Sequence, residues 1–172
     1  MAANWTDFVA NTVLTASQLN GVLDNFQDIA IFNETQSSGT NGGTATSGSF
    51  VKRTLNTTIV NNITGCSIAS SVITLAAGTY QVTARDTTFN VTTHLARLQN
   101  TTDATTTQYG GSNFCNNDNY GYSFIDAYFT ITASKNFELQ TRVGQTVATN
   151  GYGASTSMGS EVFSQITITR VA

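Results

Sequence analysis

The spacing of hydrophobic residues changes once along the chain, near residue 50, from a helical period to a strand period. Before that point, Thr15 and Gln18 form a capping box, the usual start of a helix. Apolar residues then recur every three or four positions, which places them on one face of that helix: Leu19, Val22, Leu23, Phe26 and Ile29. We therefore predict one amphipathic N-terminal α-helix, with Trp5 and Phe8 ahead of it.

A polar spacer follows the predicted helix. Residues Glu34–Ser49 are mostly Gly, Ser and Thr, a composition typical of a flexible or extended linker. A short helix needs a partner for its apolar stripe. That partner is either its own β-domain or other copies and a larger scaffold, and the spacer favours the second. We predict three parts: a helical attachment segment at 1–33, a linker at 34–49 and a β-domain at 50–172.

Beyond Phe50, apolar and polar residues alternate with a period of two. This alternation predicts strands with one core face and one outer face. The predicted core positions on the longest strands are Tyr80, Val82, Ala84, Ile125, Ala127, Phe129, Ile131, Ala133, Phe137, Leu139, Val143, Val162, Ile166 and Ile168. So many strands without a helix predict an antiparallel sandwich, and a jelly roll is the common solution at this size.

The predicted outer faces carry three aromatic residues: Phe124, Tyr128 and Phe163. Several such residues on neighbouring strands favour a buried contact between copies of the chain, here predicted as a trimer interface. The alternative is that they cover a sheet edge within one chain.

Strand direction predicts that two long loops, Tyr109–Gly121 and Gly144–Gly159, lie at one end of the domain, away from Ala172. Long loops on a rigid scaffold are common recognition sites, and aromatic rings and amides suit both sugars and protein epitopes. The alternative is that they are solvated loops or contact a neighbouring protein. The candidate receptor-binding residues are Tyr109, Asn113, Phe114, Asn117, Tyr120 and Tyr152.

Charge and composition exclude some partners. The chain has 172 residues, a net charge of −3 and only 10% charged residues. This provides no basic surface for phosphates and argues against nucleic-acid binding. No apolar run reaches the roughly 18 residues of a membrane span, so we expect no membrane insertion.

Candidate catalytic groups are scattered. The single histidine, His94, has no Ser or Cys arrangement beside it in the sequence and is expected to be structural or at an interface. Cys66 and Cys115 are expected to be free thiols, with a bridge as the alternative. Asn116–Asn119 is predicted to be a polar turn rather than a Ca²⁺ site. We expect no enzyme activity, no cofactor and no metal.

Several phrases carry a resemblance to a known class of protein. "LAAGTYQVTA" (Leu75–Ala84), "HLARLQNTTDATTTQYGGS" (His94–Ser112), "FTITASKNFELQTRV" (Phe129–Val143) and "GSEVFSQITITR" (Gly159–Arg170) resemble small tail-fibre proteins of bacteriophages. Gly78-x-Tyr80 and the closing Phe-x-x-Ile-x-Ile strand are similar to the trimeric C1q/TNF-like jelly roll. "WTDFVANTVLTASQLNGVLDN" (Trp5–Asn25) resembles the N-terminal attachment segment of phage fibre and virion proteins.

The resemblance implies a non-enzymatic homotrimer, assembled in the host cytoplasm and exposed on the phage particle. It implies a tail-fibre type of virion structural protein that attaches to the host cell surface or supports that attachment. Its partners would be other virion proteins, through the N-terminal segment, and a host surface glycan or protein. The alternative is a capsid decoration or baseplate cementing protein that binds only other virion proteins.

Overall fold

The computed structural model describes Thr15 and residues 28–171, and this part of the chain contains twelve β-strands and no helix. The predicted helix, with Trp5, Phe8, Leu19, Val22, Leu23 and Phe26, lies outside the described residues. The strands are β1 (Ile29–Gln36), β2 (Val51–Lys52), β3 (Thr57–Asn61), β4 (Ser67–Ala69), β5 (Val72–Leu75), β6 (Gly78–Phe89), β7 (Thr92–Asn100), β8 (Thr105–Tyr109), β9 (Asn113–Cys115), β10 (Tyr120–Ile131), β11 (Lys135–Val143) and β12 (Glu161–Arg170).

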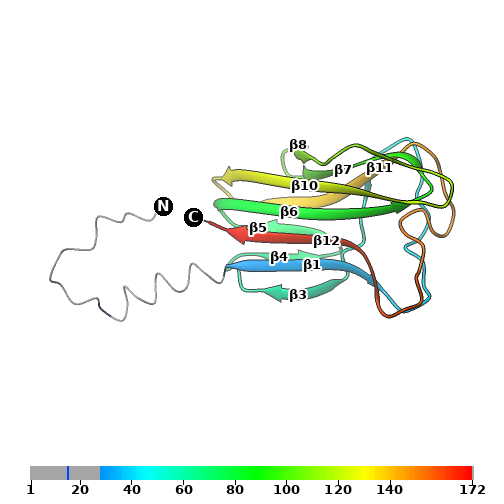
Figure 1. Ribbon diagram of the computed structural model, residues 1–172. Coiled ribbons are helices and arrows are strands. Elements are labelled where there is room, and N and C mark those ends of the chain that lie inside the picture. The colour runs from blue at the N-terminus through cyan, green and yellow to red at the C-terminus, as the bar shows by residue number, and fades with distance from the viewer. Residues whose placement is uncertain (1–14, 16–27, 172) are drawn as a thin grey trace.

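The strands form two sheets, one in front of the other in Figure 1. The first sheet has the strand order β10-β6-β12-β1-β3. The second has the order β4-β5-β11-β7-β8, with β2 paired to β11 and β9 paired to β7. The long strands pair antiparallel, β10 with β6 over its whole length and β6 with β12. The predicted antiparallel β-sandwich is thus confirmed.

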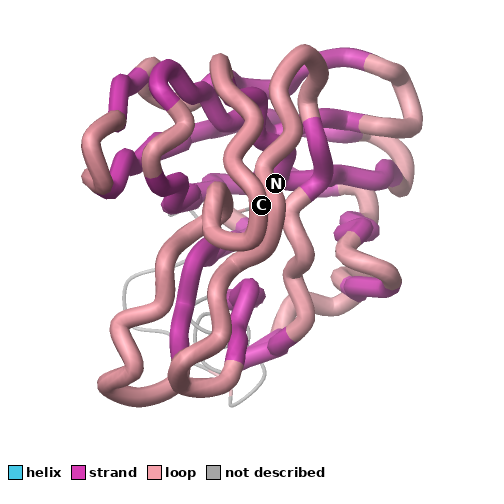
Figure 2. The backbone as a smooth tube through the Cα atoms, turned by 90° about the vertical axis from the view of Figure 1, so that its right-hand side faces the viewer, coloured by secondary structure: helices cyan, strands magenta, loops and turns pink. Residues whose placement is uncertain are grey.

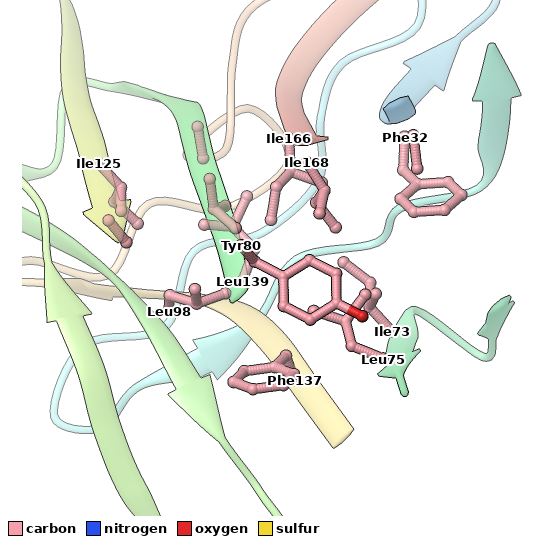
Figure 3. Packing of buried hydrophobic residues seen from close by; sticks show 14 of the residues in the cluster. Phe32, Ile73, Leu75, Tyr80, Leu98, Ile125, Phe137, Leu139, Ile166 and Ile168 are labelled. Atoms are coloured by element: carbon pink, nitrogen blue, oxygen red, sulfur yellow. The ribbon is translucent and has the colours of Figure 1, made fainter. Parts of the chain in front are cut away.

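The apolar core lies between the two sheets (Figure 3). It is built mostly by the alternating positions that the sequence predicts, because successive side chains of a strand point to opposite faces. Val162, which is only half-buried, and Ala133, which is exposed, were wrongly predicted to be core residues. The Tyr80 ring lies in the middle of this core, and its hydroxyl donates a hydrogen bond to the Ala76 carbonyl oxygen. Each large apolar side chain that is fully buried contributes about 1.5–3 kcal/mol. The largest are Phe32, Ile73, Leu75, Tyr80, Leu98, Ile125, Phe137, Leu139, Ile166 and Ile168.

The first strand begins earlier than predicted. Ile29 was assigned to the helix stripe, but it opens β1, where it pairs with Thr169 of β12. Ala30 and Phe32 are completely buried, so period two governs this stretch, and Ile29 matched the helical spacing only because it follows Phe26 by three residues. The β-domain therefore starts near Ile29, and both the 33/34 boundary and the helical assignment of Ile29 were wrong.

The predicted linker is packed against the domain. After β1, the Gly42 amide donates to the Gly153 carbonyl at 2.8 Å, and Ala45, fully buried, pairs with Val147. A Cβ on Gly42 would come within 2.5 Å of the Tyr152 carbonyl oxygen. Small residues here serve close backbone packing. The assignment of Glu34–Ser49 to a free tether was therefore also wrong.

The two ends of the sandwich differ. At one end, named the base, the Arg170 amide donates to the Asp28 carbonyl, so the described chain enters and leaves side by side. At the opposite end, named the far end, lie the loops 37–50 and 144–160 and the segment 110–119, which contains the short strand β9. Figure 2, turned by 90° from Figure 1, shows these loops toward the viewer.

Candidate interaction surfaces

Aromatic side chains form a row along the outer face of β10. Figure 1 shows β10 at the edge of the first sheet. Every second residue of β10 points outward, and the residues between them are buried along most of the strand. Neighbouring rings stack, with centroids 6.5 Å apart for Tyr120 and Tyr122 and 6.3 Å apart for Tyr122 and Phe124. We name this set the aromatic row: Tyr120, Tyr122, Phe124 and Tyr128.

Two of the three residues predicted at a trimer interface belong to this row. Phe124 is 58% exposed and Tyr128 71% exposed. Phe163 is only 3% exposed, so the prediction that it points outward was wrong. Residues 164 and 162 pair with successive residues of β1, which leaves Phe163 in a β-bulge. Its ring packs on Gly153 in the far-end loop, where a Cβ would overlap it.

Two shallow hollows lie on the outer face of the first sheet. The central hollow, of about 240 Å³, is lined from β6, β10 and β12: Thr83, Ala84, Arg85, Phe124, Ile125, Asp126, Gln165 and Thr167. The far-end hollow, of about 180 Å³, includes Tyr120, Tyr122, Arg85 and Glu161 in its lining. The aromatic row gives this face an exposed apolar area, and the two hollows make the face uneven. Such a surface marks a contact site.

Two opposite charges stand in the central hollow. Along β6 and β10, Arg85 and Asp126 are the charged side chains that point outward. In the sheet, Arg85 pairs with Phe124 and Asp126 with Thr83, so the two charges are diagonal neighbours. Neither forms an ion pair or a hydrogen bond with any residue that the structure describes.

The far-end loops are tied to one another and to the first sheet. The Tyr120 hydroxyl donates to the Ala154 carbonyl, and the Asn90 amide donates to the Asn119 carbonyl. The predicted placement of the two long loops at one end is confirmed. The predicted polar turn is also confirmed, because the Asn119 amide donates to the Asn116 carbonyl at 3.1 Å.

Glu161 holds one of these loops at the edge of the far-end hollow. Its carboxylate accepts the backbone amides of Thr156 at 2.9 Å, Ser157 at 2.8 Å and Gly39 at 3.4 Å. These amides, that of Thr156 first, lower the pKa of Glu161 because they favour its charged form. Glu161 therefore fixes the loop that borders Tyr120.

The six candidate receptor-binding residues do not form one surface. Phe114 is 57% exposed and Asn113 and Asn117 are exposed in the far-end segment, while Tyr120 belongs to the aromatic row. Tyr109 ends β8 on the second sheet, where its ring lies 6.2 Å from that of Phe50. Tyr152 is 8% exposed, so its prediction as a surface contact was wrong.

Tyr152 is buried because it covers a charged cluster between the sheets. The Arg53 guanidinium carbon lies 4.1 Å from the centre of the Tyr152 ring. Arg53 is 1% exposed and contacts Glu34 at 2.7 Å and Asp86 at 3.2 Å. Asp86 also accepts hydrogen bonds from Thr141 and Ser164. Burial raises the pKa of Glu34, and the neighbouring Arg53 partly offsets this.

No sequence pattern predicts this cluster, because its members come from β1, β6 and the segment after β2. Its position is structural: Arg53 joins carboxylates of the first sheet to β11 of the second, where its own amide donates to the Leu139 carbonyl. A partner of either charge would have to enter a site already filled by side chains. We assign the cluster to stability.

His94 and Cys115 form a second buried contact, with Nδ1 and Sγ 3.8 Å apart. Both side chains are buried, and Gly121 packs on the imidazole so closely that a Cβ would overlap it. Burial lowers the pKa of His94, which keeps the imidazole neutral at pH 7. Because both side chains are buried, we assign the pair to packing. Cys66, also free, is buried in the apolar core, which raises its pKa to about 11.

Two further searches cover the described residues. Among residues 28–171 and Thr15, no three His, Cys, Asp or Glu side chains come together as a metal site would require. The described part of the chain also has no helix long and apolar enough to span a membrane.

Comparison with known proteins shows the fold. No protein-family model and no curated protein sequence matches the chain. The structure is similar to the globular domain of zebrafish complement 1qA protein, with a TM-score of 0.52 and 14% identity over 84% of this chain and 95% of that one. It is also similar to murine APRIL at pH 5.0, with a TM-score of 0.53 and 8% identity over 82% of this chain and 97% of that one. The domain therefore has a C1q/TNF-like fold.

A further similarity is to the PRD1 vertex protein P5, with 18% identity over 84% of this chain and 97% of that one. Its TM-score of 0.46 is too low to argue from. Each of the three proteins is at most 18% identical to this chain, so the similarity concerns the fold alone.

Proposed function

We propose that this chain is a non-enzymatic virion structural protein of tail-fibre type, which assembles as a homotrimer and attaches to the host cell surface or supports that attachment. The observation that carries the proposal is the exposed aromatic row on the edge strand of a C1q/TNF-like domain. Exposed rings gathered along one strand are the kind of apolar surface that another molecule covers. Copies of the chain would cover the row around a three-fold axis.

The arrangement of the two ends supports the attachment role. The described chain enters and leaves at the base, and the far-end loops point the other way (Figure 1). A segment before residue 28 would dock into a virion scaffold from the base, through Trp5, Phe8 and the helix stripe. The exposed part of the far end would then meet the host surface, with Asn113, Phe114 and Asn117 as the candidate contacts.

Sedimentation of the purified chain at micromolar concentration tests the assembly, and a trimer is expected. A stable monomer would remove the proposed interface.

Binding of the purified chain to host cells tests the attachment. Phe114→Ser should weaken binding, whereas Ser134→Ala, on the exposed turn at the base, should not. If the intact trimer binds no host cell but is retained on phage particles, the alternative is favoured: a capsid decoration or baseplate cementing protein that binds only other virion proteins.

Deletion of residues 1–27 tests the anchor. A deletion extending to Gln36 would remove β1, with Phe32 and Glu34 buried in it, so it would unfold the domain. The shorter deletion should leave a folded domain that no longer joins particles. Phe26→Asp should have the same effect, because it puts a charge into the predicted helix contact. Normal incorporation of both variants would show that this segment is not the anchor.

A further inference from the structure

The central hollow carries two charges that the chain leaves without partners. Arg85 and Asp126 are exposed and flank Phe124, and neither makes an ion pair or hydrogen bond with the described residues. Elsewhere, exposed charges of this chain do pair, as Lys135 does with Asp103 at 2.6 Å. Among the described residues, Arg142, on the outer face of the second sheet, is unpaired as well, but in this hollow two unpaired charges of opposite sign stand together beside exposed rings.

Covering the row would make these charges costly. A partner that buries Phe124 must also take the adjacent Arg85 and Asp126 out of water. A charge removed from water destabilises a contact unless an opposite charge meets it. The hollow holds one charge of each sign, so a strongly charged ligand of either sign would satisfy one and repel the other. A partner that brings one charge of each sign satisfies both.

A second copy of this chain meets that requirement. Asp126 stands on the edge strand β10, and Arg85 one strand further in, on β6. When the edge of one copy packs on the outer face of the next, Asp126 of the first approaches Arg85 of the second. In a closed ring each copy gives Arg85 to one neighbour and Asp126 to the other, so every charge is paired.

We propose that Arg85 of one copy pairs with Asp126 of the next, and that this pair sets the register in which the aromatic rows meet. The proposal rests on the homotrimer of the proposed function and names the contact that specifies it. Like charges opposed at an interface disfavour association strongly, so the pair would also exclude wrong registers.

Charge reversal tests the pair in the full chain. Arg85→Glu and Asp126→Arg should each raise the concentration at which the trimer dissociates by at least about tenfold, because each opposes like charges at every interface. The double variant should restore assembly. Arg142→Glu, at an exposed arginine on the outer face of the second sheet, is the matched control and should leave assembly unchanged. Circular dichroism confirms that each variant is folded.

A cysteine pair distinguishes contact between copies from contact within one. Arg85→Cys combined with Asp126→Cys should give covalent dimers and trimers on a non-reducing gel. The native cysteines are buried and do not interfere. Covalent closure within single chains only, single reversals that assemble normally, or a double reversal no better than the singles would each overturn the pair and leave the trimer standing. A wild-type monomer would instead overturn the proposed function itself.

Discussion

On the outer face of the second sheet, Lys52 lies 3.6 Å from Glu138, and Arg97 donates to Gln140 and stacks 3.9 Å from the centre of the Phe50 ring. On the outer face of the first sheet, Arg85 and Asp126 have no such partners among the described residues. Charges satisfied within the chain suit a face that meets water. Arg142 on the second sheet is also unpaired within the described part of the chain, so the faces differ in that the first combines two unpaired charges of opposite sign with a row of exposed rings, the kind of surface that meets protein.

The largest effect should come from the buried charged cluster between the two sheets. Arg53→Ala would leave Glu34 and Asp86 buried without their cation, at a cost of about 3–5 kcal/mol in the free energy of unfolding. Urea unfolding measures this loss. Both sheets should unfold together. Arg142→Ala is the control and should change stability by no more than about 0.5 kcal/mol. Equal effects of the two substitutions would contradict a structural role for the cluster.

Tyr128→Asp should stop the outer face of the first sheet from associating with other copies of the chain. A carboxylate in place of the most exposed ring of the row would be buried without a partner on assembly, so the chain should sediment as a folded monomer. The matched variant is Tyr109→Asp, at a 51% exposed tyrosine on the second sheet, and it should still form trimers. If both variants assemble alike, the row has no special part in association.

Lowering the pH should loosen the loop that Glu161 holds beside the first sheet. The folded-state pKa of Glu161 lies below the ordinary value of 4.5, so the unfolded chain takes up the proton first as the pH falls. The stability that Glu161 contributes is thus present above 4.5 and is lost as the pH falls toward the folded-state pKa. Hydrogen exchange at the Thr156 and Ser157 amides should quicken in that range in the wild type. In Glu161→Gln these amides should exchange rapidly already at neutral pH, and slow exchange there would contradict the assignment.

The smallest effect is expected at the paired charges on the outer face of the second sheet. Lys52→Ala removes an ion pair that is partly exposed, and such pairs contribute no more than about 1 kcal/mol. Thermal unfolding in low and in molar salt checks this, because the difference from the wild type should shrink as salt screens the pair. A loss that is large and independent of salt would show that Lys52 acts through packing.

The alternation of apolar and polar residues was sufficient to predict strands that have one apolar face and one polar face. It predicted β6, β10 and β11 and their core residues, because these strands separate the apolar core from water. It also indicated the outward position of Phe124 and Tyr128 correctly. The fold class follows from such strands alone, since they can close only against one another.

Other features depend on contacts distant in sequence. Phe163 is buried beside a register shift in the pairing of β12 with β1, and the Tyr152 ring packs on the guanidinium of Arg53. Arg53 itself has the side chain least expected in a core, and only the two carboxylates around it make burial tolerable. A composition of Gly, Ser and Thr also could not show whether residues 37–49 are free or tightly packed.

The hydrogen bond between the Arg170 amide and the Asp28 carbonyl has a mechanical consequence. A load applied between the base and the far end runs along the strands, so the ladder between β1 and β12 is sheared and its hydrogen bonds share the force. A load that instead draws Asp28 away from Arg170 opens the same ladder from its end, beginning with the pair Ile29 and Thr169. The domain should therefore resist tension directed from base to far end and yield readily to tension across its base.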